Sequence, residues 1–144
     1  MNIFFVDNKE KFKGDFLDSC PDFKMYGDDE RISVDVLVID ATARLGFFRN
    51  RDVNTCVCPS FRFFDVVNSI RVKSAVSCGM CERDSVTFSS IGDEDAVVCF
   101  KRTICFFNKQ FEPCEFCVKF DRKRSLYSNL VLGTLRFLVN NYGG

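Results

Sequence analysis

Histidine is absent from the 144 residues of the chain. Because histidine is the side chain that most often serves as a general base near neutral pH, its absence excludes Ser-His-Asp and Cys-His catalysis in their usual forms. It also excludes zinc sites with histidine ligands. The phosphate loop Gly-x-x-x-x-Gly-Lys-Ser/Thr is missing as well, so the backbone cradle and the lysine that usually hold ATP are not present.

Proline and glycine are scarce, at 3 and 8 residues, whereas 47% of the residues are hydrophobic. This composition is typical of a packed globule and not of a disordered chain. Lys plus Arg equals Asp plus Glu at 20 each, so the chain has no overall field that would attract nucleic acid or an anionic membrane. We therefore expect no nucleic acid and no membrane among its partners.

Long apolar runs are also lacking. The longest one near the C-terminus, residues 130–139, is interrupted by Arg136 and is shorter than the roughly 20 residues of a spanning helix. The first residues carry no basic segment and reach Asp7 too early for a signal peptide. These features predict a cytoplasmic protein. In that compartment disulfides are rare, so the 9 cysteines are expected to act mainly as small buried hydrophobic residues.

The first half of the chain predicts parallel strands with helical cover. Apolar, β-branched runs predict strands at residues 3–6, 34–39, 54–58 and 73–78. Phe23, Met25 and Tyr26 predict a short strand at 23–26. Helical spacing predicts a helix through residues 12–20, and residues 41–52 are expected to be a loop or a weak helical turn. A further helix is expected to begin at Ser60, with Phe63, Val67 and Ile70 on one face.

From residue 85 the pattern alternates with a period of two, which predicts half-buried antiparallel strands joined by turns at 92–95 and 108–110. Ser125 is placed to cap a final helix that runs to about Val139. The residues expected to face inward from this helix are Leu126, Leu130, Phe137 and Leu138. The sequence therefore predicts a single α/β domain over residues 1–144, with a mostly parallel sheet in the first half and antiparallel hairpin strands and a C-terminal helix in the second.

Two acidic residues follow predicted parallel strands, Asp7 after the first and Asp40 after 34–39. Ligands of open parallel sheets bind at the carboxyl ends of the strands, so these positions predict a ligand site. Turn formation explains the same acids without a ligand. The residues expected near this site are Asp7, Asp40, Thr42, Ser60, Gly79 and Arg83. Arg83 and the neighbouring Asp84 can also be explained by a local ion pair.

The segments Phe5-Val6-Asp7-Asn8 and Val38-Ile39-Asp40 resemble the first and third strands of response-regulator receiver domains. The resemblance covers roughly residues 1–80 and implies that Asp40 accepts a phosphoryl group and that Asp7 binds magnesium. Receivers carry a lysine at the end of the fifth strand, where this chain has Ser77-Cys78-Gly79.

Two other resemblances concern the second half. Residues 75–79, 84–91 and 126–129 are similar to the end of a Mur ligase central domain, which implies architecture only because the phosphate loop is missing. The same stretch, with Phe111-Glu112-Pro113-Cys114-Glu115-Phe116, resembles small uncharacterised proteins of Firmicutes, a resemblance that implies no particular activity.

Two Cys-x-x-Cys pairs, Cys78 with Cys81 and Cys114 with Cys117, nominally match a four-thiolate zinc site. The second pair lies in an alternating strand, where residues three apart point to opposite faces. One metal ion cannot bind both from a straight strand. We therefore expect no metal and no other cofactor, and zinc binding by these four cysteines is the alternative.

Taken together, these features predict a non-catalytic module. It is expected either to contact a protein partner, for example a second copy of itself, or to sense a small ligand at the strand ends. The alternatives are a phosphoacceptor that uses Asp40 and a structural zinc protein.

Overall fold

The computed structural model describes residues 3–6, 34–40, 45 and 51–143. Within them the predicted division of the chain is confirmed: a four-stranded parallel sheet is followed by antiparallel strands and a C-terminal helix. The expected helix at 12–20, the strand at 23–26 and most of the segment 41–52 lie outside the described residues.

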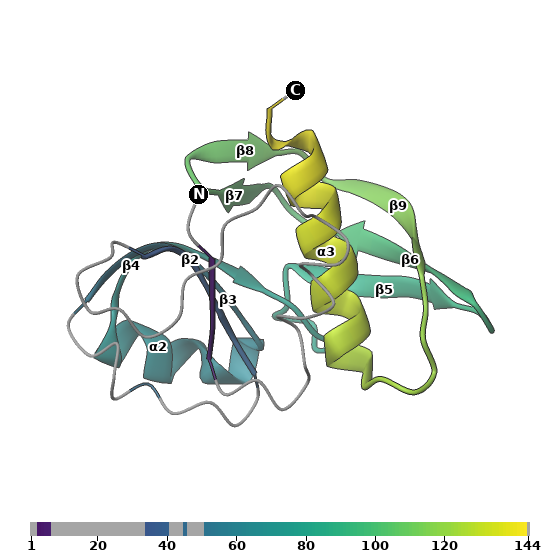
Figure 1. Cartoon of the computed structure of the whole chain (residues 1–144), viewed down its shortest axis with the longest axis horizontal. Coiled ribbons are helices and arrows are strands. Elements are labelled where there is room, and N and C mark those ends of the chain that lie inside the picture. The colour runs from purple at the N-terminus through teal and green to yellow at the C-terminus, as the bar shows by residue number, and fades with distance from the viewer. Residues whose placement is uncertain (1–2, 7–33, 41–44, 46–50, 144) are drawn as a thin grey trace.

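The parallel sheet has the strand order β1-β2-β3-β4, so neighbours in the sequence are neighbours in space. Its carboxyl ends therefore follow one another along one edge, which Figure 1 shows beside the beginning of the last helix. The strands are β1 (Ile3–Val6), β2 (Val34–Ile39), β3 (Asp52–Cys58) and β4 (Arg71–Ser77).

Both faces of this sheet are buried, as the unbroken apolar runs predict. Phe4, Leu37 and Cys56 belong to the core on the side of helix α2 (Phe63–Ser69). Val38 and Val57 face the opposite way, into a core that they share with the antiparallel strands and helix α3 (Leu126–Tyr142). Figure 1 shows α3 between the two sheets, so one continuous core joins the two halves of the chain.

The helix between β3 and β4 begins with a 3-10 turn, Ser60–Arg62, and its orientation corrects the sequence prediction. Ile70 is buried as expected, but Phe63 and Val67 are 46% and 47% exposed, and Val66 is the helical residue that packs on the sheet. The hydroxyl of Ser60 does not cap the helix, because no side-chain cap hydrogen bond is present at its start.

The second half forms a three-stranded antiparallel sheet of order β5-β6-β9 and a separate two-stranded hairpin. In the hairpin, Phe107 and Asn108 have φ values of 44° and 69°, so the turn lies one residue earlier than the predicted 108–110. The predicted turn at 92–95 joins β5 to β6. The strands are β5 (Val86–Ile91), β6 (Asp95–Phe100), β7 (Ile104–Phe106), β8 (Lys109–Phe111) and β9 (Cys114–Lys119).

Helix α3 begins where predicted, and the Ser125 hydroxyl accepts a hydrogen bond from the Ser128 N–H. Leu130 and Leu138 are buried and Phe137 stacks on Phe116 at 3.9 Å between ring centroids. Leu126 was expected to face inward, but it is 46% exposed. No helix in the described part of the chain combines the length and the apolar character needed to cross a membrane.

Candidate functional site

A pocket of about 190 Å³ lies where the carboxyl ends of β3 and β4 meet the beginning of α3. It is smaller than the roughly 300–1,000 Å³ typical of pockets for drug-sized molecules. Its lining is mainly apolar, with one carboxylate and two thiols. The lining residues are Pro59, Phe61, Cys78, Gly79, Met80, Cys81, Asp84, Leu126, Tyr127 and Leu130.

Asp84 is the charged residue of this pocket and is only 2% exposed. Its Oδ1 accepts a hydrogen bond from the Ser60 N–H and its Oδ2 accepts one from the Cys81 N–H, both at 3.0 Å. The Asp84 N–H in turn donates to the Cys81 carbonyl. The carboxylate therefore holds the loop after β4 against the start of the helical segment that follows β3.

Gly79 makes this position of Asp84 possible. A Cβ at residue 79 would lie 2.5 Å from Asp84 Oδ2, closer than non-bonded atoms can approach. The Gly79 N–H donates to the Val86 carbonyl at 3.0 Å, which fixes the glycine at the pocket wall. The glycine of the Cys-Gly-Met-Cys sequence is thus explained by the carboxylate that packs on it, and not by a metal-binding turn.

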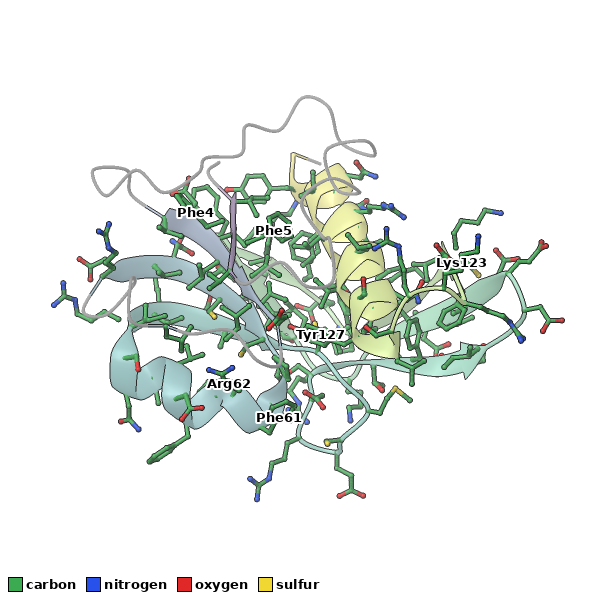
Figure 2. All side chains as sticks on the ribbon, turned by 60° about the horizontal axis from the view of Figure 1, so that its bottom comes forward. Phe4, Phe5, Phe61, Arg62, Lys123 and Tyr127 are labelled. Atoms are coloured by element: carbon green, nitrogen blue, oxygen red, sulfur yellow. The ribbon has the colours of Figure 1, made fainter. Side chains whose placement is uncertain are left out.

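Tyr127 connects the pocket to the parallel sheet. Figure 2 shows its side chain pointing from α3 toward the strands, while Phe61 lies at the start of the helical segment before α2. The Tyr127 hydroxyl donates to the Ile39 carbonyl, at the end of β2, at 2.7 Å. Burial, followed by the nearby thiols and Asp40, raises the pKa of Tyr127 well above its ordinary value. The phenol therefore stays protonated and acts as a donor.

The thiol of Cys78 lies in the pocket wall and is fully buried. Burial, followed by the electrostatic influence of Cys58 and Asp84, raises the pKa of this thiol well above its ordinary value. A hydrogen bond with Cys58 and burial do the same for the pKa of Cys56. Since a thiolate is the nucleophilic form of cysteine, this environment does not favour nucleophilic chemistry at Cys78.

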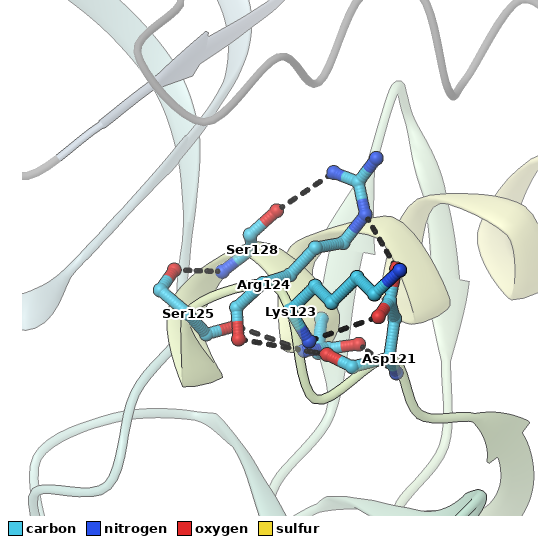
Figure 3. A network of polar contacts seen from close by, with 6 residues as sticks. Asp121, Lys123, Arg124, Ser125 and Ser128 are labelled. Carbon is cyan, nitrogen blue, oxygen red and sulfur yellow. Dashed lines mark hydrogen bonds and ion pairs between the residues drawn. The ribbon is translucent and has the colours of Figure 1, made fainter.

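The segment before α3 forms a polar network that fixes the helix beside the pocket (Figure 3). Arg124 pairs with Asp121 at 3.6 Å and also donates to the Ser128 hydroxyl. The Asn129 side chain, only 4% exposed, bonds both the N–H and the carbonyl of Asp121. Arg122 pairs with Asp93. The two arginines of the basic run 122–124 are therefore paired within this turn.

Of the six predicted site residues, Gly79 lines the pocket, and Ser60 reaches it only through its N–H, which donates to Asp84. Arg83 is exposed, and its backbone carbonyl accepts a hydrogen bond from the Arg102 side chain at 3.1 Å. The local ion pair that was the alternative explanation of Arg83 and Asp84 is not formed, and Asp84 bonds two backbone N–H groups instead.

The remaining predicted residues belong to the phosphoacceptor hypothesis. Asp7 and Thr42 lie outside the described residues. Asp40 follows β2 directly, as predicted, but it is 3% exposed. A phosphoacceptor must be reached by its donor, so this burial does not favour the hypothesis, which stays a prediction.

The four cysteines of the zinc hypothesis are not brought together. Cys78 is buried and Cys81 is exposed, while on β9 Cys114 is half-buried and Cys117 points to the exposed face. Among the residues that the structure describes, no three Cys, Asp or Glu side chains are grouped so that they could hold a metal ion. The expectation that cysteines fill the core holds for part of them: Cys56, Cys58 and Cys78 are buried, and the other five described are not.

A larger open depression of about 720 Å³ lies at the other end of the parallel sheet, at the amino ends of β2, β3 and β4. Its charged residues include Arg71 and Asp52, which pair with each other at 2.7 Å and are both exposed. Because parallel sheets bind ligands at their carboxyl ends, the smaller pocket is the better candidate.

Comparison of the chain with protein-family models, with curated proteins and with solved structures gives no match. The resemblances to receiver domains, to the Mur ligase central domain and to small Firmicutes proteins therefore stay predictions. Asp84, Phe61 and Leu130 complete the pocket but were not among the predicted site residues, since their convergence depends on contacts between distant segments.

Proposed function

We propose that the protein is a non-catalytic binding module that takes a small, mainly apolar ligand in the pocket at the carboxyl ends of β3 and β4. The observation that carries the proposal is the pocket itself: about 190 Å³ of space, lined by Leu126, Tyr127 and Leu130 of α3 and by Phe61 of the 3-10 turn before α2. Pockets of this kind, apolar with few polar groups, are the usual binding sites of small molecules.

At the buried thiol of Cys78 and the phenol of Tyr127, the protonation state favours binding over catalysis. The raised pKa values of Cys78 and Tyr127 keep both groups protonated and neutral near pH 7. An enzyme nucleophile or base needs the opposite, a group that is deprotonated or shares its proton at the working pH. No histidine is available in the chain to take that role.

Protection of Cys81 from alkylation tests the proposal. Cys81 is exposed and lines the pocket, whereas Cys117 is exposed on β9 and does not line it. A pocket ligand such as benzyl alcohol is expected to slow the modification of Cys81 by iodoacetamide, measured by peptide mass spectrometry, and to leave the rate at Cys117 unchanged. Equal rates at Cys81 with and without small apolar compounds, up to their solubility limits, would contradict the proposal.

A pair of variants localises the binding. Leu126 lines the pocket and Ile91 does not, but both are exposed, at 46% and 43%, so truncation of either is tolerated by the fold. Leu126→Ala is expected to weaken the ligand because it removes apolar contact, and Ile91→Ala is expected to leave the affinity unchanged. Equal affinities of the two variants would place the ligand elsewhere.

Protein contact is a second candidate function, which the outer side of the helical segment favours. Phe61 and Phe64 are 66% and 74% exposed and lie three residues apart, so they occupy one side of the helix together with Val67. Large exposed aromatic side chains are typical of interfaces. Sedimentation velocity on the wild type and on Phe64→Ser tests whether this surface joins two copies of the chain.

A further inference from the structure

We infer that the ligand of this pocket is a small apolar amine, bound as its ammonium ion with the Asp84 carboxylate as its counter-ion. This inference rests on the proposed function and specifies the chemical class of the ligand. It follows from the position of a buried negative charge in the wall of an otherwise apolar cavity.

The carboxylate has acceptor capacity to spare. A carboxylate offers about four lone-pair sites on its two oxygens. Asp84 uses one on each oxygen, for the N–H groups of Ser60 and Cys81. The remaining lone pairs are available to a donor in the pocket, and an ammonium group supplies up to three N–H donors together with the opposite charge.

The charge of Asp84 is not neutralised by a cation of the described residues, since no Lys or Arg there forms an ion pair with it. The nearby basic side chains bond other groups of the same loop. Lys101 Nζ donates to the carbonyls of Cys81 and Glu82 at 3.3 and 3.1 Å, and Arg102 donates to that of Arg83. Burying a carboxylate without a cation beside it costs free energy. A cationic ligand would be stabilised by this negative charge, for which the described residues provide no cation.

The rest of the lining fits the apolar part of such an amine. Phe61 and Tyr127 contribute aromatic rings, whose faces attract cations as well as apolar groups. Leu126, Leu130 and Met80 complete an apolar wall. A carboxylate or a phosphate ligand would instead be repelled by the negative charge of Asp84, so anionic metabolites are not expected to bind.

Benzylamine and benzyl alcohol test the inference, because at pH 7 they differ chiefly in charge and number of donors. We expect the wild type to bind benzylamine at least about tenfold more tightly than benzyl alcohol, measured by NMR titration that follows the Cys81 amide. Asp84→Asn is expected to remove this preference while still binding the alcohol, and Glu115→Gln, at an exposed position of β9, is expected to keep it.

The outcomes separate the inference from the proposed function. If the alcohol binds the wild type as tightly as the amine, the inference is wrong and the apolar pocket stands. If neither compound shifts the Cys81 amide, the proposed function fails and the inference fails with it. The comparison of the two compounds on the wild type decides the question even if Asp84→Asn does not fold. An unchanged preference in a folded Asp84→Asn protein, which binds the alcohol, would also overturn the inference.

Discussion

The carboxylate of Asp84 lies against the Cα of Gly79, in the space that a side chain at residue 79 would need. A Cβ there would lie 2.5 Å from Oδ2 and 2.9 Å from Cγ. The carboxylate cannot move away cheaply, because it is buried and two N–H groups hold it. Gly79→Ala is therefore expected to lower the free energy of unfolding by about 1–3 kcal/mol, measured by urea denaturation.

Gly143→Ala is the matched control for this prediction. Gly143 ends α3, its φ of −84° suits any residue, and nothing lies within 4 Å of the place that a Cβ would take there. Its substitution is expected to change stability by no more than about 0.5 kcal/mol. Equal stability of Gly79→Ala and Gly143→Ala would mean that the loop after β4 accommodates a side chain, and that Asp84 is not fixed where it lies.

The hydroxyl of Tyr127 is predicted to contribute to stability more than to the shape of the pocket. Tyr127→Phe removes the donor to the Ile39 carbonyl and keeps the ring, so the free energy of unfolding is expected to fall by about 1–3 kcal/mol while small apolar ligands still bind. Tyr142→Phe removes a similar bond, to the Phe107 carbonyl, at the last residue of α3. A smaller loss is expected there, because water can replace the donor. A larger loss at Tyr142 would contradict this explanation.

The protein is expected to lose stability in alkali. The pKa values of Cys56, Cys78 and Tyr127 are raised in the folded state above ordinary values of 9.0 for the thiols and 10.0 for the phenol. Unfolding releases these protons more readily, so the stabilisation is complete below about pH 8 and is lost as the pH rises above 9. Each group lowers the free energy of unfolding by up to about 1.4 kcal/mol per pH unit in its window.

Urea denaturation at pH 7.5 and pH 10, under reducing conditions, measures this loss. Cys78→Ala removes one of the three groups and is expected to show a shallower fall with pH than the wild type. A fall of the same steepness would mean that the Cys78 thiol ionises alike in the folded and unfolded chains.

The sheet was predictable because its residues act locally. Runs such as Val34–Ile39 are too apolar for an exposed strand and too short for a helix, so they predict strands buried on both faces. The alternation of apolar and polar residues around Phe116 and Val118 predicts strands that are buried on one face only. The face of the helix after β3 was not predictable in the same way. Phe63, Val66 and Val67 place apolar groups on more than one side, so spacing alone does not decide which side packs on the sheet.

The candidate site was predictable in its position and not in its chemistry. The carboxyl ends of the strands, with Ser60 and Gly79, follow from the parallel topology. The role of Asp84 depends on the Ser60 N–H, 24 residues away in the sequence, and on how the loop after β4 folds. Local rules suggested an ion pair with Arg83, because adjacent opposite charges are the simplest interpretation of that dipeptide.

Asn129 is a buried side chain whose amide nitrogen and amide oxygen both form hydrogen bonds. Its Nδ2 donates to the carbonyls of Asp121, Arg124 and Ser125, and its Oδ1 accepts from the Asp121 N–H. Asn129→Asp keeps the size of the side chain but turns a carboxylate oxygen toward three carbonyl oxygens. It is expected to cost more than about 3 kcal/mol of the free energy of unfolding, and more than Asn129→Ala.

Asn68→Asp is the matched control, because Asn68 is exposed on α2 and its substitution is expected to cost less than about 1 kcal/mol. The order of the two variants at Asn129 is the decisive measurement. Loss of packing alone would make alanine the worse substitution, because aspartate fills the same space. A greater loss with aspartate shows that the donors of Asn129 hold the segment before α3, and with it Leu126 and Tyr127 at the pocket. The reverse order would contradict this role.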